Sequence, residues 1–424
     1  MGQYDRKEKS QPKHGKPSSS GASKAPPRPN GGMPGWKGPG YIPKKKSAAK
    51  PTAPTTPEPP KLEYSLPVEL EQSILEVFRA TFPASNDFEE LKPTLQRVND
   101  ALLRKDLDEV FATEEHMEAY AIRWSPSRAL GYAQLLAWIC AEWKDDPCIQ
   151  QLVCDGHSER PSKIVCFGGG AAEKMAFSGL LRYLLPSEAA GKPGVPAAEV
   201  SDSLEAMNIS TTTPTTPLLH LSFLDISDWA SVLSKLEHGL NTPPTLSKYA
   251  SATARATNAS FLSPGIIEHA FTRADILSHN TEDLRAAIGT TPALLTLMSS
   301  LNDLYTTSMP RTTAFLRRIT EAAPKDSLLL VVDSPGAYSE IATTNAETGE
   351  ERRKYPMNVL LNFALVPEKT KKSDGKGSDD DEEPQPAWEK VVEKASLAYR
   401  LREGLRYPGS LENLRFQVHL FRRL

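Results

Sequence analysis

The sequence of 424 residues contains no apolar run of transmembrane length and no apolar signal core near its first residues. We therefore expect an intracellular, soluble protein without a membrane partner. Cysteine is scarce, and no two of the four cysteines have the two-residue spacing of a zinc knuckle. We interpret Cys140, Cys148, Cys154 and Cys166 as buried thiols in a reducing compartment and predict no metal site.

The sequence also lacks the Gly-x-x-x-x-Gly-Lys-Ser/Thr loop that holds the phosphates of ATP. It does contain KIVCFGGGAAE at 163–173, in which a predicted strand meets Gly168, Gly169 and Gly170 before a predicted helix. Glycines permit a sharp turn and a close ligand approach, and a helix N-terminus offers free N–H groups. A tight turn without any ligand explains the same stretch equally well. The rest of the chain has to decide.

Charge is distributed unevenly along the chain. Residues 1–61 contain 13 Lys and Arg against three acidic residues, a net charge of +10, so residues 62–424 carry −13 of the total of −3. Residues 1–61 are also rich in Pro, Gly and Ser, which predicts a disordered basic tail. Such a tail points to a polyanionic partner, and Lys44, Lys45 and Lys46 suit nuclear import or phosphate contact. A merely solubilising arm is the alternative.

Residues 62–158 have apolar side chains at helical spacing and are predicted to form a helical N-terminal extension. Within it, Ser125 is a predicted N-cap, with Pro126 at the first helical position. Trp124 directly follows Arg123, and Arg128 lies four residues after it. It could stack on a base near bound phosphate, or it could anchor a helix in the core.

From residue 159 the pattern changes to strands that alternate with helices, which predicts an α/β class, doubly wound parallel sheet in domain 159–424. Insertions are predicted at about 186–217 and 368–386, the second one carrying an acidic run that we interpret as a solvated loop. Two late strands are expected at 357–366 and 416–424, with a helix at 388–405 between them. Earlier strands are expected at 163–167, 218–225, 271–277, 293–298 and 327–333.

Ligands of doubly wound sheets bind at the carboxyl ends of the strands, where several polar residues are expected. Asp225 suits the two hydroxyls of a ribose, and Asp275 with Ile276 and Leu277 suits an adenine. Either carboxylate could instead cap a helix, but two at equivalent strand ends favour adenosine. The turn fits Gly-x-Gly-x-small rather than a dinucleotide fingerprint, which indicates S-adenosylmethionine. The remaining candidates for contact with this cofactor are Gly168, Gly169, Gly170, Ala172, Glu173 and Ser299.

Several motifs together resemble one known family, the fungal 25S rRNA (uridine-N3)-methyltransferases. The motifs are FGGGAAE at 167–173, LDISDW at 224–229, DIL at 275–277, LMSSLNDLY at 297–305, VVDSPG at 331–336, RWSPSR at 123–128, and YP, LEN and RFQ between 407 and 417. The resemblance covers about residues 65–424. It implies a class I fold with a seven-stranded Rossmann-like sheet, S-adenosylmethionine as cofactor and methylation of one uridine N3 in 25S rRNA.

The resemblance further implies a pre-ribosomal large subunit as partner, a nuclear or nucleolar location that can extend to the cytoplasm, and a monomer. Two positions depart from the expected pattern. Cys166 stands where many class I methyltransferases have an acidic residue, and Ser299-Ser300 replaces bulkier or Thr-type residues. The cofactor's amino group therefore needs another partner, for which Glu173 is the candidate.

Uridine N3 becomes nucleophilic when it loses its proton, so the reaction calls for a base or a hydrogen bond to the imidate. Asp303, with Asn302 and Tyr305 nearby, is the candidate catalytic cluster. Asp303 could instead cap a helix and Tyr305 could belong to the core. Two other functions remain open: a methyltransferase acting on protein or a small molecule, and a non-catalytic ribosome-assembly factor with the same fold.

Overall fold

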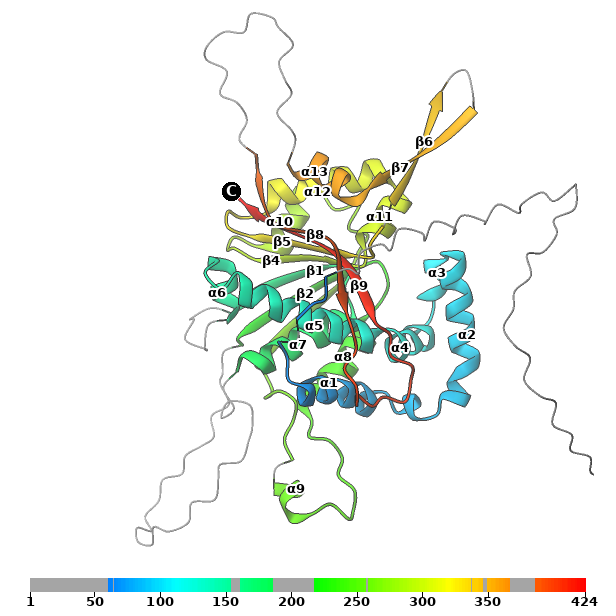
Figure 1. Cartoon of the computed structure of the whole chain (residues 1–424), viewed down its shortest axis with the longest axis vertical. Coiled ribbons are helices and arrows are strands. Elements are labelled where there is room, and N and C mark those ends of the chain that lie inside the picture. Colours follow the sequence, from blue (N-terminus) through cyan, green and yellow to red (C-terminus); the bar gives the residue numbers. More distant parts are fainter. Residues whose placement is uncertain are drawn as a thin grey trace, which may run out of the picture. The chain divides into compact units, whose positions relative to one another are not determined.

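One seven-stranded sheet forms the centre of the computed structural model, which describes residues 60–63, 65–153, 161–185, 217–256, 258–336, 338–345, 349–366 and 386–424 (Figure 1). The strand order is β3-β2-β1-β4-β5-β9-β8. The strands are β1 (Ser162–Phe167), β2 (Leu219–Asp225), β3 (Ile267–Arg273), β4 (Leu294–Met298), β5 (Leu328–Asp333), β8 (Trp388–Tyr399) and β9 (Leu414–Arg423).

The first five strands are parallel, and β9 runs antiparallel between β5 and β8. The predicted α/β class with a doubly wound, seven-stranded Rossmann-like sheet is therefore confirmed. The expectation of a wholly parallel sheet is wrong, because β9 runs antiparallel to both of its neighbours. Since β8 and β9 follow each other without a helix between them, they pair as antiparallel neighbours.

Alternation along the central strands explains why helices cover both faces of the sheet. In β1, Ile164 and Cys166 belong to one hydrophobic cluster, and Val165 and Phe167 belong to the other. A strand buried on both sides reads as a continuous apolar run, as at β5. The helices that follow the strands are α7 (Ala171–Leu184), α8 (Ala230–Asn241), α9 (Ala252–Ala256), α10 (Thr281–Ile288), α11 (Leu301–Thr307), α12 (Met309–Ala322) and α13 (Met357–Leu365).

The segment before β1 is helical, as its periodicity predicts, and its helices pack onto the same face as α7 and α8 (Figure 1). Its helices are α1 (Val68–Thr81), the 3-10 helix η1 (Pro83–Asn86), α2 (Phe88–Arg104), α3 (Leu107–Val110), α4 (Glu114–Arg123), α5 (Ser125–Glu142) and α6 (Pro147–Val153). Residues 58–424 form one compact unit.

Three local predictions concern Ser125, Trp124 and the cysteines. Ser125 is not an N-cap but the first residue of α5, because Trp124 is itself in helical conformation between α4 and α5. Trp124 packs against Tyr120 in a tilted arrangement, with ring centroids 5.2 Å apart, and is half-buried against the core. Cys140 is a buried free thiol, as are Cys148 and Cys166, whereas Cys154 lies outside the described residues.

The two elements predicted for 357–366 and 388–405 are the reverse of those observed. Residues 357–365 form helix α13, whose buried residues Met357, Leu360, Leu361 and Ala364 follow helical spacing. Residues 388–399 form strand β8, which pairs with β9. Two register shifts, at Lys390/Val392 and Lys394/Leu397, break the two-residue alternation that would have identified β8 as a strand.

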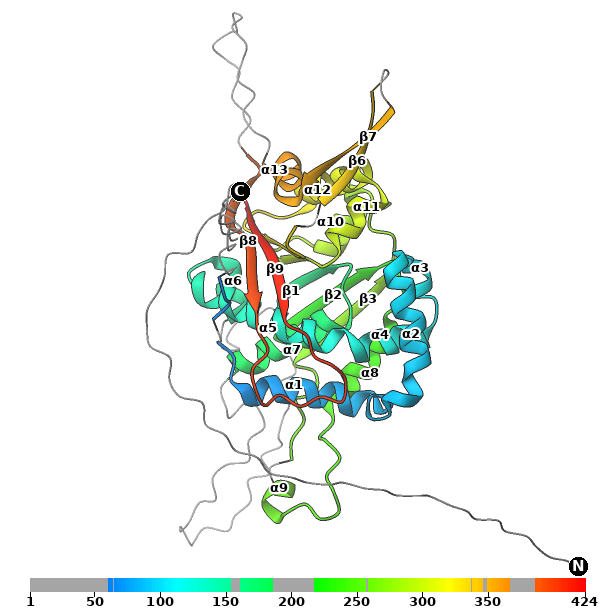
Figure 2. The ribbon, with the colours of Figure 1, turned by 45° about the vertical axis from the view of Figure 1, so that its right-hand side comes forward.

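A two-stranded sheet of β6 (Tyr338–Asn345) and β7 (Gly349–Pro356) stands between β5 and α13 in the chain and was not predicted. The segment that links β8 to β9 runs beside α1 (Figure 2), where the side chain of Gln72 bonds both the N–H and the carbonyl of Arg406. The predicted disordered tail and most of the two predicted insertions lie outside the described residues.

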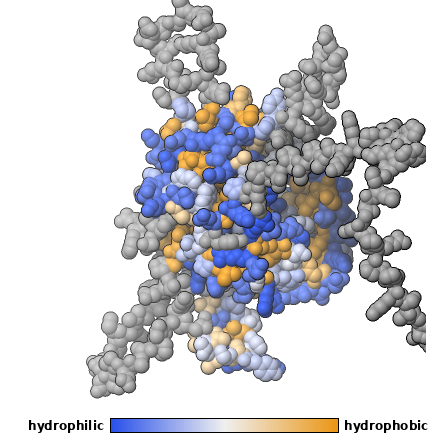
Figure 3. Space-filling model, viewed as in Figure 1, coloured by the Kyte–Doolittle hydropathy of each residue, from blue (hydrophilic) through white to orange (hydrophobic). Residues whose placement is uncertain are grey.

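The surface drawn in Figure 3 is largely hydrophilic and is interrupted by hydrophobic areas. Among the described residues, no helix combines the length and the apolar character needed to span a bilayer. In the same part of the chain, no group of three or more His, Cys, Asp or Glu side chains is arranged to hold a metal ion.

Candidate functional site

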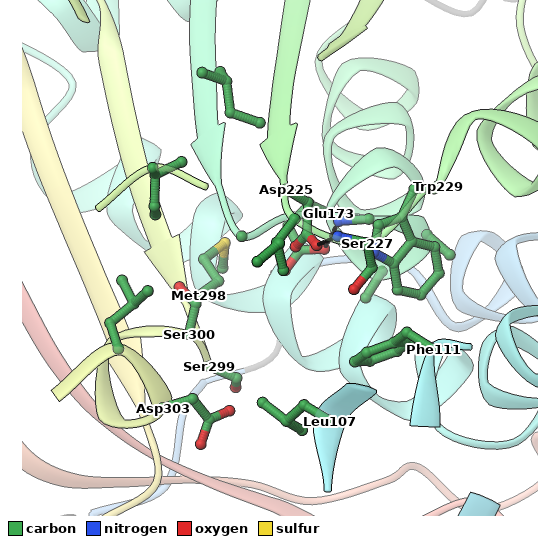
Figure 4. A pocket seen from close by; sticks show the side chains of 18 of the residues that line it. Leu107, Phe111, Glu173, Asp225, Ser227, Trp229, Met298, Ser299, Ser300 and Asp303 are labelled. Atoms are coloured by element: carbon green, nitrogen blue, oxygen red, sulfur yellow. Dashed lines mark hydrogen bonds between the residues drawn. The ribbon is translucent and has the colours of Figure 1, made fainter. Parts of the chain in front are cut away.

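A cavity of about 270 Å³ lies at the carboxyl ends of β1, β2 and β4 (Figure 4). The loops after these strands form one wall, and side chains from the helices before β1 form the other. The side chains of this second wall include Leu107, Phe111 and Tyr120. A parallel sheet brings its strand ends to one edge, which is why residues more than 100 positions apart in the chain meet here.

The turn that follows β1 requires all three of its glycines for steric reasons. Gly168 has φ +75°, and a Cβ there would lie 2.7 Å from Cβ of Ser300. A Cβ on Gly170 would lie 2.8 Å from the ring of Trp229. A Cβ on Gly169 would lie 2.7 Å from Cβ of Cys166, but only Gly168 and Gly170 line the cavity. The turn is therefore closely packed against its neighbours and open on the cavity side.

Glu173 lies in the first turn of α7 and lines the cavity while being 6 % exposed. Its Oε2 accepts the N–H of Gly170 at 2.8 Å, so this carboxylate helps to cap the helix. Burial raises the pKa of Glu173 to about 6, against the backbone hydrogen bonds and the charge of Arg128, which lower it. Ala172, one residue earlier, also lines the cavity.

Asp225 ends β2 with its carboxylate toward the cavity (Figure 4). Oδ1 accepts the N–H of Ser227 at 2.7 Å, which leaves lone pairs on Oδ2 for a ligand. Burial raises the pKa of this carboxyl to about 6. The next side chain, Ile226, lines the cavity with 61 % of its surface exposed, an unusual position for a large apolar residue.

Asp275 follows β3 and has partners of its own in the structure. Its Oδ1 accepts the N–H of Leu277 at 2.9 Å, and its Oδ2 pairs with Arg311 at 2.8 Å. These bonds fix the loop on which Ile276 and Leu277 lie. All three loop residues line the cavity, and Arg273, just before the loop, donates from Nε to the carbonyl of Ile226 at 3.1 Å.

Ser299 follows β4 in the left-handed conformation, with φ +59°. Its Oγ lies 2.7 Å from the hydroxyl of Tyr132, and its N–H donates to the carbonyl of Val332 at 2.7 Å. A non-glycine residue at positive φ persists where neighbouring bonds hold it in place. Ser299 lines the cavity, and Tyr132 supports it from the buried core.

The predicted catalytic residues take different places. Asp303 lines the cavity and is exposed at its edge, with its carboxylate beside Leu107 (Figure 4). Partial removal of water by the surrounding protein raises its pKa, against the charges of Arg128 and Lys105. Asn302 and Tyr305 are not among the lining residues. Tyr305 is 3 % exposed and belongs to the hydrophobic core.

Asp333 at the end of β5 positions the helix that carries Asp303. Its Oδ2 accepts the N–H of Asn302 at 3.0 Å, and its Oδ1 accepts the N–H of Ser334 at 2.8 Å. Burial raises the pKa of Asp333 to about 6. The contribution of Asn302 to the site thus runs through its backbone.

Several lining residues were not among the sequence candidates. Those from the segment before β1 could not be found by strand-end reasoning, because only packing brings that segment over the sheet, although the motif RWSPSR at 123–128 had already marked Ser125 and Arg128. Ile226 and Trp229 could have been predicted from the sequence, since both lie within four residues after Asp225, the carboxylate that ends β2. The unforeseen lining residues are Leu102, Leu107, Phe111, Tyr120, Ser125, Arg128, Ala171, Leu224, Ile226, Ser227, Trp229, Ala274, Met298, Ser300, Leu304 and Thr307.

The residues of the cavity suit an adenosine joined to an amino acid. Asp225 offers oxygens that can accept the hydrogens of two vicinal hydroxyls. Ile226, Ile276 and Leu277 offer apolar surface for a ring. A side chain on Gly170 would collide with the ring of Trp229. The glycine therefore keeps the space beside the turn free for a ligand.

The fold and this cavity define the class of protein: an α/β enzyme of the class I methyltransferase type, with a cavity at the carboxyl ends of the strands, where the ligands of such sheets bind. Residues 78–422 match the family model described as "Putative SAM-dependent methyltransferase". The match spans more than half of the chain, so the protein belongs to this family. It is an enzyme that uses S-adenosylmethionine.

Individual proteins are also similar to this chain. The 25S rRNA (uridine(2843)-N(3))-methyltransferase of Saccharomyces cerevisiae is 28% identical over 361 residues, which cover 82% of this chain and 85% of the relative. A SAM-dependent methyltransferase from Methanosarcina mazei has a TM-score of 0.30 at 10% identity, covering 63% of this chain and 95% of the other. The 1,6-didemethyltoxoflavin-N1-methyltransferase of Burkholderia thailandensis has a TM-score of 0.33 at 10% identity, with coverages of 77% and 88%.

Proposed function

We propose that this enzyme methylates N3 of a uridine in the RNA of the large ribosomal subunit. The observation that carries the proposal is the agreement between the acceptor named for the yeast relative and a carboxylate, Asp303, at the edge of the cavity. Uridine N3 carries an acidic imide proton, so a nearby carboxylate suits this acceptor.

In this proposal the cavity wall formed by the strand ends holds the cofactor. Asp225 accepts the ribose hydroxyls, and Ile226, Ile276 and Leu277 contact the adenine. Asp275 keeps their loop in place and is the candidate for the exocyclic amine. Gly168, Gly169, Gly170 and Ala172 form the turn beside the methionine part, and Glu173 accepts its ammonium group. Ser299 closes this side of the cavity.

The chemical step is a displacement in which the cofactor supplies an electrophilic methyl group. The protein has to orient the uracil and to remove or hold its N3 proton. Asp303 is proposed as the group that takes this proton, with Asn302 and Tyr305 as supports of its helix. Because N3 lies on the base-pairing edge, the target base has to be unpaired or extruded from a helix. The apolar side chain of Leu107, beside Asp303, is suited to pack on it.

The remaining proposals concern organisation and location. Segment 62–158 is proposed to act as the cover of the methyltransferase domain 159–424. The basic tail, residues 1–61, is proposed to contact RNA phosphates of the pre-ribosomal large subunit. The working place of such an enzyme is the nucleus or nucleolus, with the cytoplasm as a second site, and we propose that it works as a monomer.

The proposal predicts the loss of one modified nucleoside. In a strain that lacks this protein, mass spectrometry of large-subunit rRNA nucleosides should show a decrease in N3-methyluridine. Re-expression of the wild-type chain should restore it. If N3-methyluridine stays unchanged in the deletion strain, the acceptor is not rRNA uridine, and a protein or small-molecule acceptor takes its place.

Cofactor affinity should depend on pH. The pKa of Asp225 and that of Glu173 are each raised to about 6, so both groups lose their charge as the pH falls through 6. The ionised forms are the ones that accept hydroxyl and ammonium hydrogens, so affinity should be full above pH 7 and, because two groups take up protons, decrease by up to about 100-fold per pH unit below 6. Calorimetric titrations with S-adenosylhomocysteine between pH 5 and 8 measure this. Asp225→Asn should bind more weakly and show a shallower dependence, and an equally steep decrease in that variant would contradict the assignment.

A further inference from the structure

Arg128 is the only Lys or Arg side chain among the described residues that line the cavity, where four carboxylates are found. Those carboxylates belong to Glu173, Asp225, Asp275 and Asp303. In the part of the chain that the structure describes, Asp275 has its own cation, Arg311, but Arg128 forms no ion pair. A half-buried guanidinium without a counter-ion is costly, so its presence in a ligand cavity needs a reason.

Arg128 is held in place by uncharged partners. Its Nη1 donates a hydrogen bond to the hydroxyl of Tyr120, and its guanidinium carbon lies 5.4 Å from the centre of the same ring. Tyr120 in turn packs against Phe111 and Trp229, at centroid distances of 5.1 and 6.0 Å. A planar guanidinium fixed on an aromatic ring keeps its remaining N–H groups for a ligand.

Arg128 is within electrostatic range of two cavity carboxylates, Glu173 beside the glycine turn and Asp303 at the edge. Electrostatic interaction links it to Glu173, whose carboxylate caps the helix that follows the turn. Tyr132, one helical turn after Arg128, bonds Ser299 at the end of β4. Arg128 and Glu173 thus bring a cation and an anion to the same cavity, and the two are not bonded to each other.

We propose that Arg128 binds the α-carboxylate of the methionine part of S-adenosylmethionine, opposite Glu173, which receives the α-ammonium group. The two fixed charges match the two charges of a zwitterionic amino acid. The inference rests on the cofactor part of the proposed function and not on the identity of the RNA acceptor. It also gives the segment before β1 a direct role in the site, because Arg128 comes from α5.

The test compares S-adenosylmethionine with decarboxylated S-adenosylmethionine, which keeps every other group. Calorimetry on the full-length wild-type chain should show about 10- to 100-fold weaker binding of the decarboxylated compound, the size of one lost charge-assisted contact. In Arg128→Met the two compounds should bind equally, at the weaker level. Arg128→Lys, which keeps the charge but not the fork, should retain part of the preference.

Arg123→Met is the matched control. Arg123 also lies over an aromatic ring, that of Trp124 at 5.6 Å, but it pairs with Glu412 and does not line the cavity. This variant should keep the full preference for the carboxylate. Circular dichroism and thermal unfolding identify the variants that fold. If Arg128→Met does not fold, the decision rests on Arg128→Lys, whose preference for the carboxylate should be smaller than that of the wild type.

The outcomes separate the hypotheses. A wild-type chain that binds neither compound contradicts the cofactor part of the proposed function itself. If the wild type binds both and Arg128→Met keeps the wild-type preference, the carboxylate assignment is wrong. If Arg128→Met keeps that preference but needs more RNA for half-maximal methylation, Arg128 belongs to the acceptor side, and the inference is overturned as well.

Discussion

Replacement of Asp303 by alanine should decrease the turnover number about 10²- to 10⁴-fold, the usual contribution of a positioned general base. Asp303 is the carboxylate at the edge of the cavity, and its pKa is raised because the surrounding protein removes part of its water. A raised pKa makes a carboxylate a better proton acceptor. Affinity for S-adenosylhomocysteine should stay within about twofold, since the contacts proposed for the cofactor come from other residues.

The measurement is single-turnover methylation of an rRNA fragment with saturating cofactor, alongside calorimetry with S-adenosylhomocysteine. Asp100→Ala is a suitable control, because Asp100 is an exposed carboxylate on α2 that does not line the cavity. Full activity of the Asp303 variant would remove Asp303 from the mechanism. Equal losses in turnover and in cofactor affinity would instead make Asp303 part of the cofactor site.

Replacement of Gly168 by valine should weaken cofactor binding by about 100-fold or more. Valine at φ +75° is strained by about 1–3 kcal/mol. In addition, its Cβ would lie 2.7 Å from Cβ of Ser300. The turn has to move to relieve both, and its movement changes the cavity wall between the ends of β1 and β4.

Gly265→Val separates backbone strain from damage to the site. Gly265 has φ +80°, and a Cβ there would meet nothing within 4 Å. It lies before β3 and outside the cavity. Both variants should unfold at lower temperature than the wild type, but only Gly168→Val should lose affinity for S-adenosylhomocysteine. Unchanged affinity in Gly168→Val would mean that the glycine turn is only a structural turn.

Local patterns predicted a large part of this architecture. Four of the five parallel strands, the helix after the glycine turn and the helical segment before β1 have period or composition signals that depend on residues close in the chain. The third strand was expected at 271–277 but is Ile267–Arg273, because Ile276 and Leu277 belong to the loop that lines the cavity and not to the strand. The errors occurred where the local signal is ambiguous. At 357–365 a short apolar run is equally typical of a strand and of a buried helix, and at 388–399 two register shifts disturb the alternation of β8.

The sequence by itself determined the strand-end part of the cavity. Glycines, Asp225 and the Asp275 loop could be assigned to one edge because all parallel strands of a doubly wound sheet end on the same side. Ten of the 13 predicted site residues line the cavity, namely Gly168, Gly170, Ala172, Glu173, Asp225, Asp275, Ile276, Leu277, Ser299 and Asp303. Their roles in binding and catalysis remain predictions.

Only the tertiary structure decided what faces these strand ends. The segment before β1 brings Leu107, Phe111 and Arg128 to the cavity because its helices α1, α4 and α5 pack on α7 and α8, and no local pattern encodes that docking. The same holds for the choice within α11, where a helix directs Asp303 to the cavity and Tyr305 to the core. Interactions between residues close in the sequence determine where each strand ends. The wall formed by the segment before β1 depends instead on contacts between segments far apart in the sequence.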